Sequence, residues 1–155
     1  MCFEYILHLL TGLLTPVIAI LAVIIAWRQY RTAKQKLTLD LFDRRLCIYE
    51  EVQNFLLLII RDADVEFDES RRFRNSVSAA EFLFKKEIVE YIDTIYKRAI
   101  KLEDWNRQFR DDFQVKPEGY DHAKVVEGKH IELKWLAAQL EPAKKMFKKY
   151  LDLGK

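Results

Sequence analysis

The sequence predicts an all-α protein in which one N-terminal transmembrane helix is followed by a cytoplasmic bundle of about four helices. Three observations lead to this fold class. Residues 9–27 form an uncharged run of nineteen residues. The 155 residues include only four glycines and three prolines, so few positions interrupt a helix. Beyond the run, apolar residues recur every three or four positions, which is the period of an α-helix.

The uncharged run is long enough to cross a bilayer, because nineteen residues rising about 1.5 Å each span roughly 30 Å. Glu4 precedes the run, whereas four cations follow it directly: Arg28, Arg31, Lys34 and Lys36. The positive-inside rule then predicts an anchor over residues 1–30 and a cytoplasmic domain over residues 31–155. A cleaved signal peptide would carry its positive charge before the apolar stretch, and a buried core helix is usually shorter.

Five small residues within the run fall at spacings of four, four, three and four: Thr11, Thr15, Ala19, Ala22 and Ala26. This spacing places them on one stripe of a helix. Small residues let membrane helices approach closely, and threonine hydroxyls can bond across the contact. The stripe predicts association of transmembrane helices, although small residues are also common in such helices without any such role.

The first half of the cytoplasmic domain is expected to begin with a helix that continues from the anchor to about residue 60. Its apolar face consists of Phe42, Leu46, Tyr49, Val52, Leu56 and Ile59. The charged stretch at residues 61–75 predicts a connecting loop. Ser78 and Glu81 fit a capping box, so the next helix is expected to start there and to end near Arg110.

In the second half of the domain, apolar residues again recur at the spacing of an α-helix. The helix from Ser78 presents an apolar face of Phe84, Ile88, Tyr91, Ile92, Ile95, Ala99 and Leu102. Residues 114–122 contain a proline and a glycine and predict a loop. The following helix is expected to turn Ile131, Leu136 and Leu140 inward, with Gly128 as a weak point. Pro142 marks a restart, because proline suits a first helical turn.

The composition and the motifs favour a protein that is not an enzyme. His130 and Glu132 match part of a zinc deaminase motif, but the downstream P-C-x-x-C is missing. The acidic residues at 62, 64 and 66 lack the glycine and the final carboxylate of an EF-hand. No catalytic residue, metal ligand or cofactor is predicted. The net charge of +2 does not call for duplex nucleic acid as a partner.

Cations and aromatic residues gather in three predicted loops or helix ends. The candidate ligand-binding residues are Arg71, Arg72, Arg74, Trp105, Arg107, Arg110, Lys116, Tyr120, His122 and Lys124. Guanidinium groups match phosphate oxygens and aromatic rings stack on bases, so this mixture suits a nucleotide. The alternative is a solvated surface on which the arginines balance the acidic run just upstream.

Three segments carry a resemblance to known proteins: residues 27–45 (WRQYRTAKQKLTLDLFDRR), 82–102 (FLFKKEIVEYIDTIYKRAIKL) and 147–153 (FKKYLDL). They resemble a widespread group of small bacterial single-pass membrane proteins. In size and layout, the chain resembles the membrane effectors of type III CRISPR antiviral defence.

The resemblance implies an inner-membrane protein whose cytoplasmic domain binds the second messenger cyclic tetra-adenylate. It also implies a homotetramer in which the ligand perturbs the membrane helices and so disrupts the lipid bilayer or opens a pore. Four copies would offer one set of cations and aromatic rings four times to a ligand with four phosphates. The alternative is a single-pass membrane adaptor or scaffold that docks a cytoplasmic protein partner.

Overall fold

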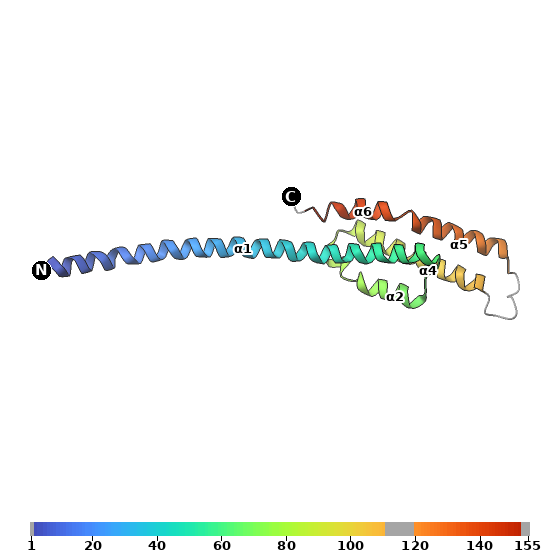
Figure 1. The fold of residues 1–155 in the computed structure, drawn as a ribbon, viewed down its shortest axis with the longest axis horizontal. Coiled ribbons are helices and arrows are strands. Elements are labelled where there is room, and N and C mark those ends of the chain that lie inside the picture. Colours follow the sequence, from blue (N-terminus) through green and yellow to red (C-terminus); the bar gives the residue numbers. More distant parts are fainter. Residues whose placement is uncertain (1, 111–119, 153–155) are drawn as a thin grey trace. The chain divides into compact units, whose positions relative to one another are not determined.

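The computed structural model describes residues 2–110 and 120–152, and the side chains of residues 16–109 and 120–152. The described residues form helices and no strand, so the all-α prediction is confirmed. Six helices follow one another (Figure 1): α1 (Cys2–Asp62), α2 (Phe67–Ser76), α3 (Ala80–Leu83), α4 (Lys86–Arg110), α5 (His122–Ala137) and α6 (Leu140–Lys148). The chain divides into two units, Met1–Asp40 and Leu41–Lys155.

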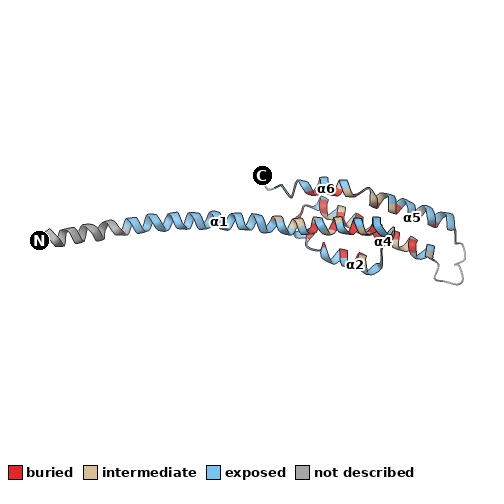
Figure 2. Cartoon of the chain, viewed as in Figure 1, coloured by how far each residue is buried: buried red, intermediate tan, exposed pale blue. Residues whose placement is uncertain are grey.

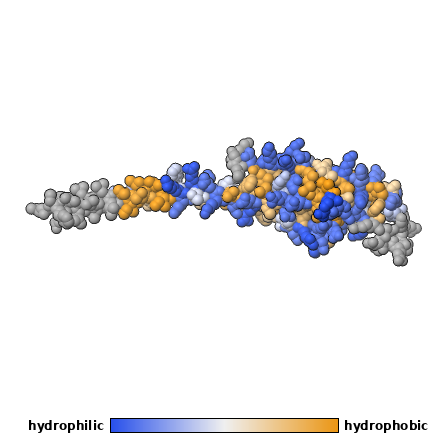
Figure 3. Space-filling view, in the orientation of Figure 1, coloured by the Kyte–Doolittle hydropathy of each residue, from blue (hydrophilic) through white to orange (hydrophobic). Residues whose placement is uncertain are grey.

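The structure of the first unit contradicts the prediction of a membrane anchor. Within the part of the chain that the structure describes, no helix combines the length and the apolar content needed to cross a bilayer. The predicted transmembrane helix at 9–27 and the predicted inner-membrane location are therefore wrong. The helix α1 continues through Arg28 and Arg31 without a break, and Figure 3 shows the change from apolar to polar surface.

The small-residue stripe falls partly outside the described side chains, which do not include those of Thr11 and Thr15. Ala19, Ala22 and Ala26 are exposed on α1. Every described residue from 16 to 41 is exposed, as the unbroken pale blue of this helix shows (Figure 2). The predicted association through the stripe presupposes a transmembrane helix, which the described residues do not provide.

The second unit has a continuous hydrophobic core to which α1, α2, α4, α5 and α6 all contribute (Figure 2). Two predicted apolar faces are confirmed at their centres: the face of the helix that ends near residue 60 and the face of the helix that ends near Arg110. The fully buried side chains there are Val52, Leu56, Ile59, Ile88, Ile95, Ala99 and Leu102, all at 0% exposure. Burying each large aliphatic side chain contributes about 1.5–3 kcal/mol, so these positions dominate the stability of the bundle.

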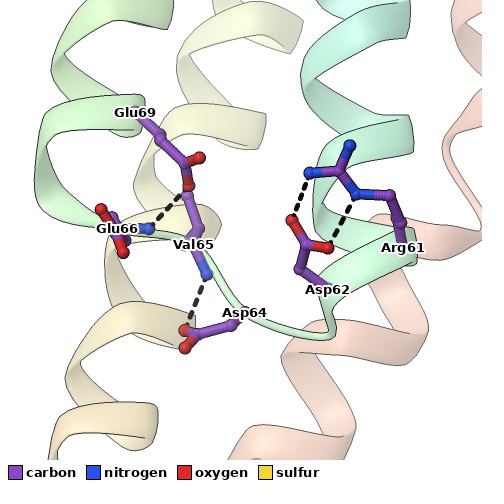
Figure 4. A network of polar contacts seen from close by, with 6 residues as sticks. All are labelled: Arg61, Asp62, Asp64, Val65, Glu66 and Glu69. Atoms are coloured by element: carbon purple, nitrogen blue, oxygen red, sulfur yellow. Dashed lines mark hydrogen bonds and ion pairs between the residues drawn. The ribbon is translucent and has the colours of Figure 1, made fainter.

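The connection between α1 and α4 differs from the predicted loop, because residues 67–76 form helix α2. The backbone N–H of Glu66 donates to the Glu69 carboxylate at 2.9 Å, which satisfies a donor at the helix start (Figure 4). Phe73 is buried, and its ring stacks on Phe55 with 4.1 Å between the centroids. The capped start and the buried aromatic ring hold a charged segment in helical form.

A true turn is confined to the residues between Asp62 and Phe67. Ala63 takes a positive φ of 51°, which reverses the chain after α1. The Asp64 carboxylate accepts the backbone N–H of Val65 at 2.7 Å (Figure 4) and the side-chain amide of Asn106. Asn106 is 1% exposed and lies on α4, so the turn is tied to the core.

The predicted helix start at Ser78 is wrong. The short helix α3 begins at Ala80, and Phe84 then adopts an extended conformation (φ −128°, ψ 164°) before α4 begins at Lys86. The break lets the Phe84 ring pack edge-on against Phe147, with 5.1 Å between the centroids. Packing of one aromatic ring therefore outweighs the local capping signal.

Helices α4 and α5 pack against each other through a polar contact and a close approach. Arg98 donates to Glu132 at 3.0 Å and lies over the Trp135 ring at 4.3 Å. Leu136 is buried as predicted, whereas Ile131 is 52% exposed, so its predicted inward position is wrong. Glu132 rather than Ile131 faces α4, because the carboxylate of Glu132 pairs with Arg98.

The restart at Pro142 is confirmed, because α5 ends at Ala137 and Pro142 lies in the first turn of α6. The Tyr91 hydroxyl on α4 donates to the backbone oxygen of Gln139 at this corner, at 3.2 Å. Burial raises the pKa of Tyr91 to about 12. This hydrogen bond joins α4 to the junction of α5 and α6.

Candidate nucleotide-binding site

Aromatic and cationic side chains meet where α4 ends and α5 begins. The rings of Phe109 and His122 stack with 5.7 Å between their centroids, and the Tyr120 hydroxyl lies 3.0 Å from His122 Nδ1. Lys129 Nζ lies 5.0 Å from the Phe109 centroid. We refer to these four residues as the ring cluster. It combines three aromatic rings with an ammonium group at the surface.

The start of α5 places the ring cluster. Asp121 is the N-cap of α5, and its carboxylate accepts the backbone N–H of Lys124 at 3.2 Å. This cap fixes His122 as the first residue of the helix. Lys129 lies seven residues further on, two turns along the same face. The cap and the helical period therefore bring His122 and Lys129 to Phe109 on α4.

The close approach of α4 and α5 depends on Gly128. A Cβ at this position would meet the Trp105 ring at 2.5 Å. Only glycine leaves room for the indole, which is half-buried between the helices. The Trp105–Gly128 contact therefore helps to set the packing of α4 on α5, which brings the residues of the ring cluster together.

The ring cluster contains two of the predicted residues and two that were missed. Tyr120 and His122 were predicted, whereas Phe109 and Lys129 were not. Phe109 is 43% exposed and lies in the last turn of α4. The seven-residue spacing from His122 to Lys129 is a signal that could have identified the lysine. The partnership with Phe109 depends on how α4 and α5 pack, which no local pattern shows.

The other predicted residues of this region have structural partners or fall outside the description. Arg107 forms an ion pair with Asp104 one turn earlier. Lys124 is exposed on the first turn of α5. The Arg110 side chain and Lys116 lie outside the described residues.

Two of the three predicted arginines of α2 form ion pairs. Arg71 pairs with Asp68 at 3.2 Å, and Arg74 pairs with Asp93 at 2.9 Å. Arg72 lines a cavity of about 230 Å³ that it shares with Glu51 and Glu69. In Figure 1 the end of α4 and the start of α5 extend to the right of α2. Arg71 and Arg74 are thus paired with carboxylates, and none of the three arginines is among the contacts of the ring cluster.

Ion pairs, including ones between separate helical segments of the second unit, lower the pKa of Asp93 and of Glu87. Lys97, and with it Arg74, holds the pKa of Asp93 below its ordinary value. Lys149, together with the hydroxyl of Tyr150, lowers the pKa of Glu87. Both carboxylates join separate helical segments, so their roles are structural. Among residues 16–109 and 120–152, no group of three or more histidines, cysteines or acids is placed to hold a metal ion.

The comparisons with known proteins add no family: no protein-family model, curated protein or solved structure matches this chain. The site is therefore interpreted from its own geometry.

Proposed function

We propose that the chain is a non-enzymatic binding protein that recognises a phosphate-bearing nucleotide at the ring cluster. The observation that carries this proposal is the chain of contacts in which Tyr120 meets His122, His122 stacks on Phe109, and Phe109 lies under the ammonium of Lys129. An exposed aromatic ring stacks on a nucleobase, and each stacked base contributes about 1–3 kcal/mol. The ammonium of Lys129 supplies a charge for a nearby phosphate.

The ligand we propose is a cyclic oligoadenylate, with cyclic tetra-adenylate as the first choice. The resemblance to type III CRISPR effectors suggests this second messenger of antiviral defence. A ligand with several bases and phosphates would engage ring clusters of several copies of the chain. Each additional contact then becomes intramolecular, which raises the overall affinity of weak individual sites.

The test is calorimetric titration of the full chain with cyclic tetra-adenylate, linear tetra-adenylate and adenosine monophosphate. We expect the cyclic ligand to bind most tightly. The variants Phe109→Ala and Lys129→Ala should each weaken binding by about tenfold or more, because each removes a stacking or charged contact. Phe82→Ala is the matched control, since Phe82 is 88% exposed on α3 and makes no contribution to the ring cluster.

Two results would contradict the proposal. One is no heat of binding with any of the three ligands. The other is equal loss of affinity in the Phe109 and Phe82 variants, which would indicate non-specific adhesion to exposed rings. Circular dichroism of each variant shows whether the bundle remains folded.

A second candidate function, docking of a protein partner as an adaptor, is favoured by one observation. Phe82 is 88% exposed and Phe67 is 59% exposed, and large exposed aromatic side chains often anchor protein interfaces. A partner that binds the wild-type chain and the Phe109→Ala variant, but not the Phe82→Ser variant, would support this function. Loss with Phe109→Ala alone would point back to the ring cluster.

A further inference from the structure

One face of α1 carries a heptad pattern between residues 20 and 41. Its positions alternate in spacing between three and four residues: Ile20, Val23, Trp27, Tyr30, Lys34, Leu37 and Leu41. We call this set the α1 seam. Alternating spacings of three and four are the pattern of coiled coils, in which such residues occupy the a and d positions. The seam extends over three heptads and contains one charged residue, Lys34.

The apolar members of the seam are all exposed. Trp27 is 65% exposed, Tyr30 68% and Leu37 61%. The opposite face of the same segment is largely polar, with Arg28, Gln29, Thr32 and Lys36 lining it. The seam is therefore a distinct stripe along residues 27–41 and not simply part of a uniformly apolar helix. It also differs from the stripe of small residues, which lies one position away in the helical register.

A helix with such a face needs a partner. Helical segments in water are marginal without packing, because nucleation is costly and propagation gains little per residue. Residues 16–41 are exposed throughout, so no described part of the chain covers them. Exposed contiguous apolar surface of this kind marks an interaction site.

We propose that the α1 seam is the interface between copies of this chain, arranged as a parallel coiled coil. A second copy is the occupant because a heptad face is self-complementary: the knobs of one helix fit the holes of an identical helix. A single lysine at an a position sets register in such assemblies at some cost in stability. Lys34 is the residue of the seam that has this property.

The distribution of apolar residues along α1 favours the parallel orientation. Between Val17 and Ile25 the exposed apolar side chains surround the helix, whereas residues 28–40 are rich in charge. In a parallel pair, the apolar segment of one copy lies against the same segment of the other. In an antiparallel pair it would lie against Arg31, Lys34, Lys36 and Asp40 of the other copy, which would leave apolar surface poorly covered.

The first test compares two leucines of the same helix by sedimentation of the full chain. Leu37 is in the seam, whereas Leu39 is 53% exposed and points to the opposite face. Leu37→Glu should weaken self-association by at least about tenfold, because it places a charge in the interface. Leu39→Glu adds the same charge two residues away and should associate like the wild type.

The second test fixes orientation and register by disulfide formation. In a chain with Cys2→Ser and Cys47→Ser, the variant Lys34→Cys should form a disulfide between identical positions of two copies. Lys36→Cys lies on the opposite face and is the matched control, which should remain a thiol. Efficient bonding at position 34 alone requires a parallel, in-register seam.

The proposal is overturned if the wild-type chain stays monomeric up to its solubility limit. It is also overturned if Leu37→Glu and Leu39→Glu behave alike, or if position 36 forms disulfides as readily as position 34. The seam does not depend on nucleotide recognition, so a monomeric chain would leave the ring cluster untouched. Failure of nucleotide binding would likewise leave the seam untouched.

Discussion

The contact between Gly128 and Trp105 shows how one absent side chain positions two helices. Glycine costs about 1 kcal/mol relative to alanine inside a helix, so its place in α5 looks unfavourable from propensity alone. The structure explains it, because the indole ring occupies the space a Cβ would need, with Trp105 Cε2 only 2.5 Å away. The predicted weak point of the helix is where the Trp105 ring of α4 packs against the backbone of α5.

Gly128→Ala is expected to destabilise the chain by about 1–3 kcal/mol, because the new methyl overpacks against a half-buried indole. In a Trp105→Ala background the same substitution should be neutral or stabilising, since only the helix propensity remains. A double-mutant cycle from urea unfolding measures this coupling. Equal effects of Gly128→Ala in the two backgrounds would contradict the steric explanation.

The Arg98–Glu132 pair is a second contact in which one residue decides the stability of the α4–α5 packing. The Glu132 side chain is only 10% exposed. Glu132→Gln should lower the free energy of unfolding by about 2 kcal/mol, because the Arg98 guanidinium loses its charged partner in a partly buried place. Urea denaturation measures the change.

Glu90→Gln is the control for Glu132→Gln, because Glu90 pairs with Lys86 on the surface and both side chains are well exposed. Its loss should cost less than about 0.5 kcal/mol. If Glu90→Gln lowered the free energy of unfolding as much as Glu132→Gln, the loss of charge, and not burial, would determine the destabilisation.

At the scale of elements, α2 is attached to the bundle by its buried Phe73 ring and to α4 by an ion pair. Its Arg74 reaches Asp93 on α4, which also binds Lys97. These cations lower the pKa of Asp93 below its unfolded value of 3.8. A depressed folded pKa contributes stability that is present above the unfolded pKa and is lost as the pH falls through the folded pKa.

The stability of the chain should therefore fall as the pH drops below about 4. Asp93→Asn should reduce stability at neutral pH and make the acid side of the profile shallower, because Asp93 no longer takes up a proton on unfolding. Thermal unfolding between neutral pH and pH 3 tests this for both chains. If the stability of the two chains falls in parallel with pH, other carboxylates cause the acid sensitivity. Glu87, whose pKa is also lowered, would be the next carboxylate to replace.

Local pattern predicted the long helices well and the short ones poorly. The central faces of α1 and α4 have regular apolar spacing over many turns, so Val52 and Ile92 could be assigned to the core from sequence. The helix α2 could not, because its ten residues are mostly charged and its helical state depends on Phe73 stacking on Phe55. The same limit applied to the ring cluster, where Phe109 and His122 meet only through packing of α4 on α5.

The whole molecule consists of one unit with a core and one whose described side chains are all exposed. The length of the uncharged run and the cations that follow it suggested a membrane anchor, but no described helix combines the length and the apolar content to cross a bilayer. The described side chains of residues 16–40 are exposed, and the proposed partner of their apolar face is the α1 seam of a second copy.

Amide hydrogen exchange should show whether residues 20–37 are packed against a second copy through the α1 seam. In the wild-type chain, amides of residues 20–37 should exchange slowly, whereas in Leu37→Glu they should exchange rapidly because an unpacked helix frays. Amides of the α4 core around Ile92 should be equally protected in both chains. Rapid exchange of residues 20–37 in the wild type would mean that the seam is unpaired in solution.

Burial of the Tyr91 phenol makes the stability of the bundle depend on pH in the alkaline range. With a folded pKa of about 12, the phenol keeps its proton in alkaline solution where a solvated tyrosine would lose it. An unfolded chain releases that proton near its ordinary value of 10, so rising alkalinity draws the equilibrium toward the unfolded state. The corner where α6 starts is thus one alkali-sensitive joint of the bundle, and tyrosinate absorbance at high pH, compared with that of a Tyr91→Phe variant, would record its opening.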